Sequence, residues 1–276
     1  MLRYVYICLF FLCFSGFTYS QEKHYPFGAG EDITYKVYYH LGFVWLSAAQ
    51  VSFSVNDTLY HNKNKLCLKS QGASLSSYSW IFSVKDHFLS IVDKPSLQPL
   101  VYYRNTKEGS HSVNNRITFN SSQHKAFTFV NDSDTLPYHD TVHYKNYLRD
   151  VLTSVYYVRN IPFEKLEKGS IFNVKTIMDH KIVYIKVDYL GKEEITHKNK
   201  NKYWSYKIAA QTIEGSIFAK NQKLYVWIST DKNRIPLKIS SEILVGSVEA
   251  YLDKVKNIHY PQSSIMKDFA IQKNHH

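Results

Sequence analysis

Apolar and polar residues alternate along most of the chain. The alternation is clearest at residues 33–39 and 49–55, where every second residue is apolar or aromatic. A period of two is typical of a β-strand that buries one face. Comparable runs predict further strands at about 65–72, 80–92, 100–104, 111–119, 124–130, 171–178, 181–190, 203–211, 216–219, 223–230, 235–244 and 247–258.

Short polar segments separate these runs, such as Asn56-Asp57, Asn131-Asp132 and Asp231-Lys232-Asn233. Short connections favour antiparallel neighbours, because a parallel crossover needs a dozen or more residues. The chain contains no glycine-rich phosphate-binding loop and no alternation of strands with helices. The pattern therefore predicts a mainly β protein, built as a curved antiparallel sheet or an open β-barrel.

One stretch, about 141–159, has a different period. Its large apolar residues are spaced by three or four positions, which predicts an amphipathic helix with Asp140 as N-cap and an end near Asn160 and Pro162. A single helix among strands has to bury its apolar stripe against the sheet, so we expect it in the concave face. The residues of the stripe are Tyr147, Leu148, Val151, Leu152, Val155 and Tyr156.

The first 20 residues have the composition of a secretory signal peptide. Arg3 precedes an uninterrupted apolar run at 5–14, and small residues follow before Gln21. The run is shorter than the ~20 residues of a spanning helix, so we expect cleavage after Ser20 and no transmembrane anchor afterwards. The sequence thus predicts an exported protein, periplasmic or associated with the outer envelope.

Cleavage would leave Cys67 as the sole cysteine, which excludes an internal disulfide. Cys67 lies between two leucines, so we expect a buried, inert thiol. No segment resembles a linker, and residues 21–261 are predicted to form a single β-rich domain. Periodicity is lost at 262–276, which we expect to be a disordered tail.

The formal net charge is +11, and loss of Arg3 with the leader leaves +11 − 1 = +10. The lysines are scattered through turn-like tracts such as 61–65 and 197–202, and no zinc-finger spacing or RNA-binding motif is present. We therefore expect no nucleic-acid partner. An anionic membrane surface or an acidic glycan remains compatible with the charge.

Residues that could carry chemistry are few. His139 and His143 are four positions apart and would share a helix face suited to zinc, but capping by Asp140 is the favoured interpretation. We predict no catalytic residue, no metal and no cofactor. The candidate ligand-binding residues lie on the predicted helix and in one strand, although a structural role is the alternative for each polar member; they are Tyr147, Asp150, Val151, Arg159 and Trp227.

Several segments carry a resemblance to a known family. They are DVLTSVYYVR at 150–159, Gly169, WISTDKNRIP at 227–236, GSV at 246–248, and FGAGE at 27–31 followed by Tyr35. Together they resemble the exported bacterial family catalogued as domain of unknown function 3108, over about residues 28–258. The resemblance implies export and the fold class, and no catalytic residue. The closing hairpin is also similar, more weakly, to LolA-like periplasmic lipoprotein carriers.

Three functions follow as hypotheses, and the third is a hydrolase, for which the sequence contains no nucleophile or metal motif. The first is a non-catalytic envelope protein that binds a lipid, an acyl chain or another apolar ligand in the hollow of the sheet. The alternative is a structural or interaction protein with a filled core, whose partner is an envelope protein or a glycan. An open apolar pocket beneath the helix would favour the first, and a filled interior the second.

Overall fold

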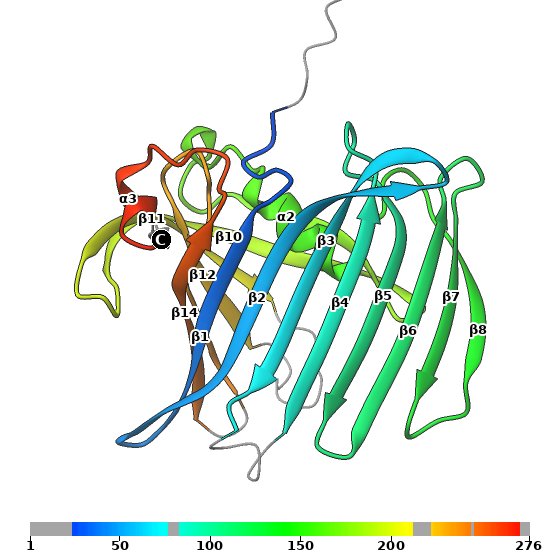
Figure 1. Ribbon diagram of the computed structural model, residues 1–276, viewed down its shortest axis with the longest axis horizontal. Helices are drawn as coiled ribbons and strands as arrows, with labels where there is room; N and C mark the ends of the chain where they lie inside the picture. Colours follow the sequence, from blue (N-terminus) through cyan, green and yellow to red (C-terminus); the bar gives the residue numbers. More distant parts are fainter. Residues whose placement is uncertain (1–23, 77–82, 212–221, 244–245, 271–276) are drawn as a thin grey trace, which may run out of the picture.

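The computed structural model describes residues 24–76, 83–211, 222–243 and 246–270. These residues form one antiparallel sheet of 14 strands, in the order β8-β7-β6-β5-β4-β3-β2-β1-β14-β13-β12-β11-β10-β9 (Figure 1). The strands are β1 (Asp32–Leu41), β2 (Val44–Tyr60), β3 (Lys63–Ser74), β4 (Val84–Val92), β5 (Pro99–Glu108), β6 (His111–Asn120), β7 (Lys125–Asp132), β8 (Tyr138–His143), β9 (Ile171–Met178), β10 (Lys181–Thr196), β11 (Lys202–Gln211), β12 (Lys223–Ser229), β13 (Pro236–Glu242) and β14 (Ser247–Lys256).

The sheet consists of two meanders in chain order. Strands β1 to β8 form one and β9 to β14 the other, and the pairing of β1 with β14 joins them. The mainly β, antiparallel architecture predicted from the alternation is thus confirmed. Every predicted strand in the described ranges is present, whereas the predicted run at 216–219 lies outside them.

The sheet curls around the helix α2 (Val151–Arg159), which lies between the two meanders (Figure 1). On one side α2 contacts β3 and β4, and on the other it contacts β9. The two edges of the sheet approach each other as well, since the Tyr138 hydroxyl on β8 is 2.6 Å from Nδ1 of His180, in the turn after β9. The result is a nearly closed, barrel-like shell with α2 inside.

The predicted helix at 141–159 is wrong in its first ten residues. Residues 141–143 belong to β8, and the helix begins after its N-cap Asp150, not after Asp140. The reason is that Tyr138 and Val142 pair with β7 and extend the sheet by one strand. Leu148 is buried from a loop, so it continued the three-to-four spacing without being helical.

The core divides into three apolar clusters on the concave side and at one end of the sheet. The largest contains Leu152 and Tyr156 of α2 together with Leu68, Tyr102 and Ile117 from the strands facing them. These side chains are at most 3% exposed, so the space directly beneath α2 is filled. Cys67 is also buried, as expected, and burial raises the pKa of its thiol.

The expectation of a disordered tail is wrong for residues 262–270. A short helix, α3 (Ser264–Lys267), follows Pro261, and Met266 and Phe269 are 0% and 5% exposed within the second cluster. Two apolar anchors within four residues are enough to hold this segment, although it is too short to show a period. Among the helices of the described ranges, none combines the length and apolar character needed to span a bilayer.

Candidate functional site

The concave face carries polar residues at positions where the strand pattern calls for apolar ones. On β6, Asn115 has the same orientation as Val113 and Ile117, and it is 4% exposed. The residue opposite Asn115 in the strand pair is Arg104 on β5. Arg104 is two positions from buried Tyr102 and therefore lies on the same face. Buried polar groups need hydrogen-bond partners to offset the loss of water. The inner face of β4 to β6 is therefore the first place to look for a binding site.

Asp150 is the deepest of these groups. It is fully buried, and its Oδ1 accepts hydrogen bonds from the Thr153 backbone N–H at 2.8 Å and from the Ser90 hydroxyl at 2.7 Å. The first bond caps the N-terminus of α2. The second carboxylate oxygen, Oδ2, is buried without a partner among the described residues. Burial raises the pKa of Asp150 to about 6, against the effect of these hydrogen bonds.

Two more polar atoms on this face lack partners in the described part of the chain. They are the hydroxyl of Tyr102 and Oδ1 of Asn115. Tyr102 on β5 lies opposite Ser90 on β4 in the strand register. Burial raises the pKa of Tyr102, and the negative charge of Asp150 adds to that rise. The hydroxyl of Ser90, the residue opposite Tyr102 in the strand pair, donates to Asp150.

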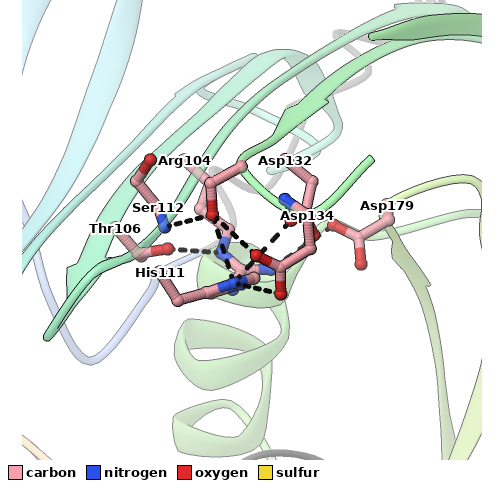
Figure 2. Close-up of polar contacts among 8 residues, drawn as sticks. Arg104, Thr106, His111, Ser112, Asp132, Asp134 and Asp179 are labelled. Atoms are coloured by element: carbon pink, nitrogen blue, oxygen red, sulfur yellow. Dashed lines mark hydrogen bonds and ion pairs between the residues drawn. The ribbon is translucent and has the colours of Figure 1, made fainter. Parts of the chain in front are cut away.

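The turn between β9 and β10 closes over the same face. Asp179 Oδ1 in this turn accepts hydrogen bonds from Asn115 Nδ2 at 2.9 Å and from Arg104 Nη1 at 3.3 Å. Arg104 and Asp179, both labelled in Figure 2, come from opposite parts of the sheet. On β4, Asp86 has one buried oxygen without a partner in the described ranges. Burial, with a contribution from Glu108, raises the pKa of Asp86 to about 6.

We define the inner polar cluster as six polar residues that lie on the inner face of β4 to β6 or pack over it. Four of their buried oxygens lack a partner among the described residues, and three of the four are on side chains no more than 4% exposed. Carboxylate and amide oxygens only accept hydrogen bonds, so the cluster is suited to a hydrogen-bond donor such as a hydroxyl or an ammonium group. The members are Asp86, Tyr102, Arg104, Asn115, Asp150 and Asp179.

A second group of polar side chains lies at the rim of the same strands. His111, Asp132 and Asp134 bring one ring nitrogen and two carboxylate oxygens within 4.8 Å of one another (Figure 2). His111 Nδ1 is 3.1 Å from Asp134 Oδ2, and Asp132 Oδ1 accepts the backbone N–H of Asp134. The second contact is an ordinary Asx turn, so these residues fix the loop after β7.

Arg159, a predicted ligand-binding residue, forms a buried ion pair instead. Its two terminal nitrogens contact the two carboxylate oxygens of Glu31 at 2.7 and 2.8 Å, and Nη2 also donates to the backbone oxygen of Asn233 at 2.9 Å. Burial by itself lowers the pKa of Arg159, but Glu31 raises it overall. The pair ties the end of α2 to the start of β1 and to the turn before β13.

The other predicted site residues are dispersed. Val151 is half-buried in the first turn of α2, and Tyr147 is half-buried in the loop before it, where its hydroxyl donates to the backbone oxygen of Ser96. Trp227 lies on β12, where its Nε1 donates to Glu193 at 2.6 Å. The structure therefore brings Asp150 alone of the five predicted residues into the inner polar cluster.

The histidines considered for zinc lie on a strand, not on a helix. His139 and His143 are both exposed on β8, where four residues span roughly 13 Å. Two side chains that far apart along a strand do not share an ion. The spacing that suits a helix is thus the wrong spacing for the element that forms.

Among the surface hollows formed by described residues are two that do not lie beneath α2. One, of about 610 Å³, is lined by Thr230–Lys232 and His259–Ile265 near α3. The other, of about 240 Å³, lies on the opposite face of β3, β4 and β5 from the inner polar cluster and includes Lys69, His87 and Tyr103.

A family model described as "Protein of unknown function (DUF3108)" matches residues 34–253, which is most of the chain. The chain belongs to the DUF3108 family. This confirms the resemblance drawn from the segments around α2 and β12, while the weaker likeness to LolA-like carriers stays a prediction. No curated protein matches the sequence of this DUF3108 member.

A solved structure shares the fold of this DUF3108 chain. It is the crystal structure of a β-barrel-like protein of domain of unknown function DUF1849 from Brucella abortus. The two superpose with a TM-score of 0.50 and 10% sequence identity, over 83% of this chain and 97% of that chain. At this identity the likeness establishes a common architecture and nothing about activity.

Sequence reasoning missed most of the inner polar cluster of this DUF3108 chain, although a signal was present. Asn115 interrupts the apolar face of its strand between Val113 and Ile117, and Asp86 does so between Val84 and Phe88. A polar residue at an apolar position of an alternating strand marks an inward-facing polar group. For Asp179 there was no such signal, because it lies in a turn whose contact with β5 and β6 depends on the curl of the sheet.

We expect Asp150→Asn to stabilise the protein at pH 8 by roughly 1 to 3 kcal/mol and to have little effect near pH 4. The carboxyl of Asp150 has a folded-state pKa of about 6, above its unfolded value of roughly 3.9. Its contribution to stability is therefore present below pH ~4 and is lost as the pH rises through ~6. Asparagine keeps the N-cap and does not titrate. Urea unfolding of both proteins at pH 4.5, 6 and 8 measures the difference, and a difference that does not change with pH would contradict the burial of a charge.

Proposed function

We propose that this DUF3108 protein is an exported, non-catalytic binding protein of the cell envelope. Its ligand is a small amphiphilic molecule, such as a lipid, held on the concave face of the sheet. The hydroxyl or ammonium groups of the ligand donate hydrogen bonds to the inner polar cluster, and its apolar part lies along β1, β2, β13 and β14. The leader-like sequence of residues 1–20 supports export.

The observation that carries the proposal is the set of unpartnered buried oxygens. Tyr102, Asn115 and Asp150 each have one such atom, and each side chain is no more than 4% exposed. A buried polar group without a partner costs about 1–3 kcal/mol, so three of them represent a substantial unmet demand. A ligand with several donor groups would meet that demand.

The concave face beside the inner polar cluster supplies an apolar surface. Val51 and Phe53 on β2 share this face with Val55, and cross-strand register continues it through Val37 on β1 to Ala250 on β14. Most of these side chains are half-buried, in contrast to the fully buried residues beneath α2. Half-buried apolar side chains on a concave face are suited to contact with an apolar chain.

We infer binding and not catalysis because the polar side chains of the cluster have structural roles. Asp150 caps α2, and Asp179 anchors a turn through Arg104 and Asn115. These side chains are committed to holding the fold, whereas catalysis requires a nucleophile or a base that is free to react.

Native mass spectrometry of the protein purified from its own envelope, followed by organic extraction, tests the proposal. We expect a bound species carrying hydroxyl or amine groups. In Tyr102→Phe, which removes one hydroxyl, occupancy should fall about three- to tenfold. Tyr103→Phe is the matched control, because Tyr103 is the next residue on the strand and faces outward.

A clean apo mass of the wild-type protein would overturn the proposal, because the inner polar cluster would then hold only water. A bound species whose occupancy is unchanged in Tyr102→Phe would also overturn it. A bound species whose occupancy falls equally in Tyr102→Phe and Tyr103→Phe would place the ligand elsewhere. Both variants keep the aromatic ring, so loss of folding does not confound the comparison.

A second function is favoured by the filled space beneath α2. Leu152 and Tyr156 pack there against the strands, and this is the filled interior expected of a structural or interaction protein. In that case the partner is an envelope protein or a glycan that contacts the outer surface. The apo mass described above would support this alternative.

A further inference from the structure

The hairpin between β1 and β2 ends in an exposed apolar tip. Phe43 is fully exposed, Val44 is 52% exposed and Trp45 is 45% exposed, all within three consecutive residues. The hairpin extends past the neighbouring strands at the lower left of Figure 1. Single exposed apolar residues are ordinary on a protein surface, but three in succession at a protruding turn mark a contact surface.

A positive charge lies directly beside this tip. The ring of Trp45 stacks on His40 across the hairpin at 4.3 Å, and the ammonium group of Lys198 lies 4.1 Å from the centre of the same ring. Lys198 comes from the turn between β10 and β11, which carries exposed Lys200 as well. The whole chain has a formal net charge of +11.

We propose that the tip formed by Phe43, Val44 and Trp45 inserts into the surface of an anionic lipid bilayer, with Lys198 beside the headgroups. Tryptophan and phenylalanine are suited to the boundary between headgroups and acyl chains, where an aromatic ring is partly solvated. Lysine near an anionic surface adds an attraction that depends on ionic strength. The proposal concerns a surface separate from the inner polar cluster and does not depend on its ligand.

Charge and shape select the bilayer over other occupants. A second copy of this chain would also carry a positive charge of +11, so two tips with their lysines would repel each other. A tip of three residues is small for a stable protein interface, which typically involves 20 or more residues on each side. Shallow insertion into lipid requires only a few apolar side chains together with basic residues.

Sedimentation with vesicles of phosphatidylglycerol and phosphatidylcholine, at low and high salt, tests the proposal. We expect binding to weaken as the salt concentration rises. Binding to vesicles of phosphatidylcholine alone should be weaker than binding to the mixed vesicles. The double variant Phe43→Ser/Trp45→Ser should bind at least tenfold more weakly. Lys198→Gln should bind about fivefold more weakly at low salt.

Leu59→Ser is the matched control. Leu59 is 69% exposed on the same strand, β2, but at its opposite end, so its loss should leave vesicle binding unchanged. Brominated lipids should quench the fluorescence of the wild type, and Trp45→Phe should lose that quenching while keeping most of the binding. Circular dichroism establishes that each variant is folded.

Three results would overturn the proposal. They are vesicle binding by the double variant equal to that of the wild type, no binding of the wild type to anionic vesicles, and a concentration-dependent dimer in sedimentation velocity that the double variant abolishes. The last result would assign the tip to contact between two copies of the chain. None of these results bears on the proposed ligand of the concave face, because its test uses different residues.

Discussion

Replacing Arg159 by Met is expected to lower the free energy of unfolding by about 3–5 kcal/mol, because it leaves Glu31 buried without its cation. The side chain of Glu31 is 0% exposed, and both of its carboxylate oxygens bind Arg159. Methionine fills much of the same volume as arginine. The loss of stability therefore reflects mainly the unpaired charge of Glu31 and only to a small extent a cavity. Urea unfolding at pH 7 gives the free energy.

The double variant Glu31→Leu/Arg159→Met separates charge from packing. With both charges removed, the loss should be smaller than that of Arg159→Met, since apolar replacements of buried ion pairs are often close to neutral. Arg116→Met is the control, because Arg116 is exposed and contacts the Tyr103 ring at 5.5 Å; we expect less than about 1 kcal/mol there. An equal loss in the Arg159 and Arg116 variants would disprove the importance of the buried pair.

Gly246→Ala is the second substitution with a large expected effect, a loss of about 3 kcal/mol or more. Gly246 has φ +81°, and a Cβ atom there would lie 2.3 Å from the backbone oxygen of His40 on the neighbouring β1. The clash is with main chain in the strand pair that joins the two meanders, so a side-chain rotation cannot relieve it. Thermal unfolding followed by circular dichroism measures the effect.

Gly109→Ala isolates the conformational part of that cost. Gly109 has φ +62° with nothing within 4 Å of the added Cβ. The Gly109→Ala variant should therefore lose about 1–2 kcal/mol of stability. If both alanine variants lose the same stability, the close approach of Gly246 to His40 contributes nothing and the register of β14 on β1 has to be reconsidered.

The strands were predictable from the sequence because each buries one face and thus alternates. The start of α2 was not, since Leu148 precedes the helix yet packs in the same core as its apolar stripe. Asp150 was the decisive residue, because it caps a helix and would have set the boundary had its role been recognised. Local spacing does not reveal whether a buried residue belongs to a helix or to the loop before it.

The candidate site was predictable only in part. Asp150 was identified as an unusual polar residue, but Ser90, which donates a hydrogen bond to it, lies on β4, 60 positions away in sequence. Arg159 stood out for the same reason, and its partner Glu31 is 128 positions away in sequence. Pairings over such distances are set by topology, which the alternation of a single strand does not encode.

The pairing of β1 with β14 has a consequence for synthesis. Each meander can assemble as its strands leave the ribosome, because their neighbours follow one another in sequence. One edge of β1 pairs with β2, but its other edge waits for residues 247–256, which follow all the other strands in the described chain. Until then the nascent chain exposes an open strand edge of the kind that recruits other unpaired strands. A chain terminated before β14 would keep that edge permanently, so premature stops late in the message should yield aggregates and not a slightly shortened protein.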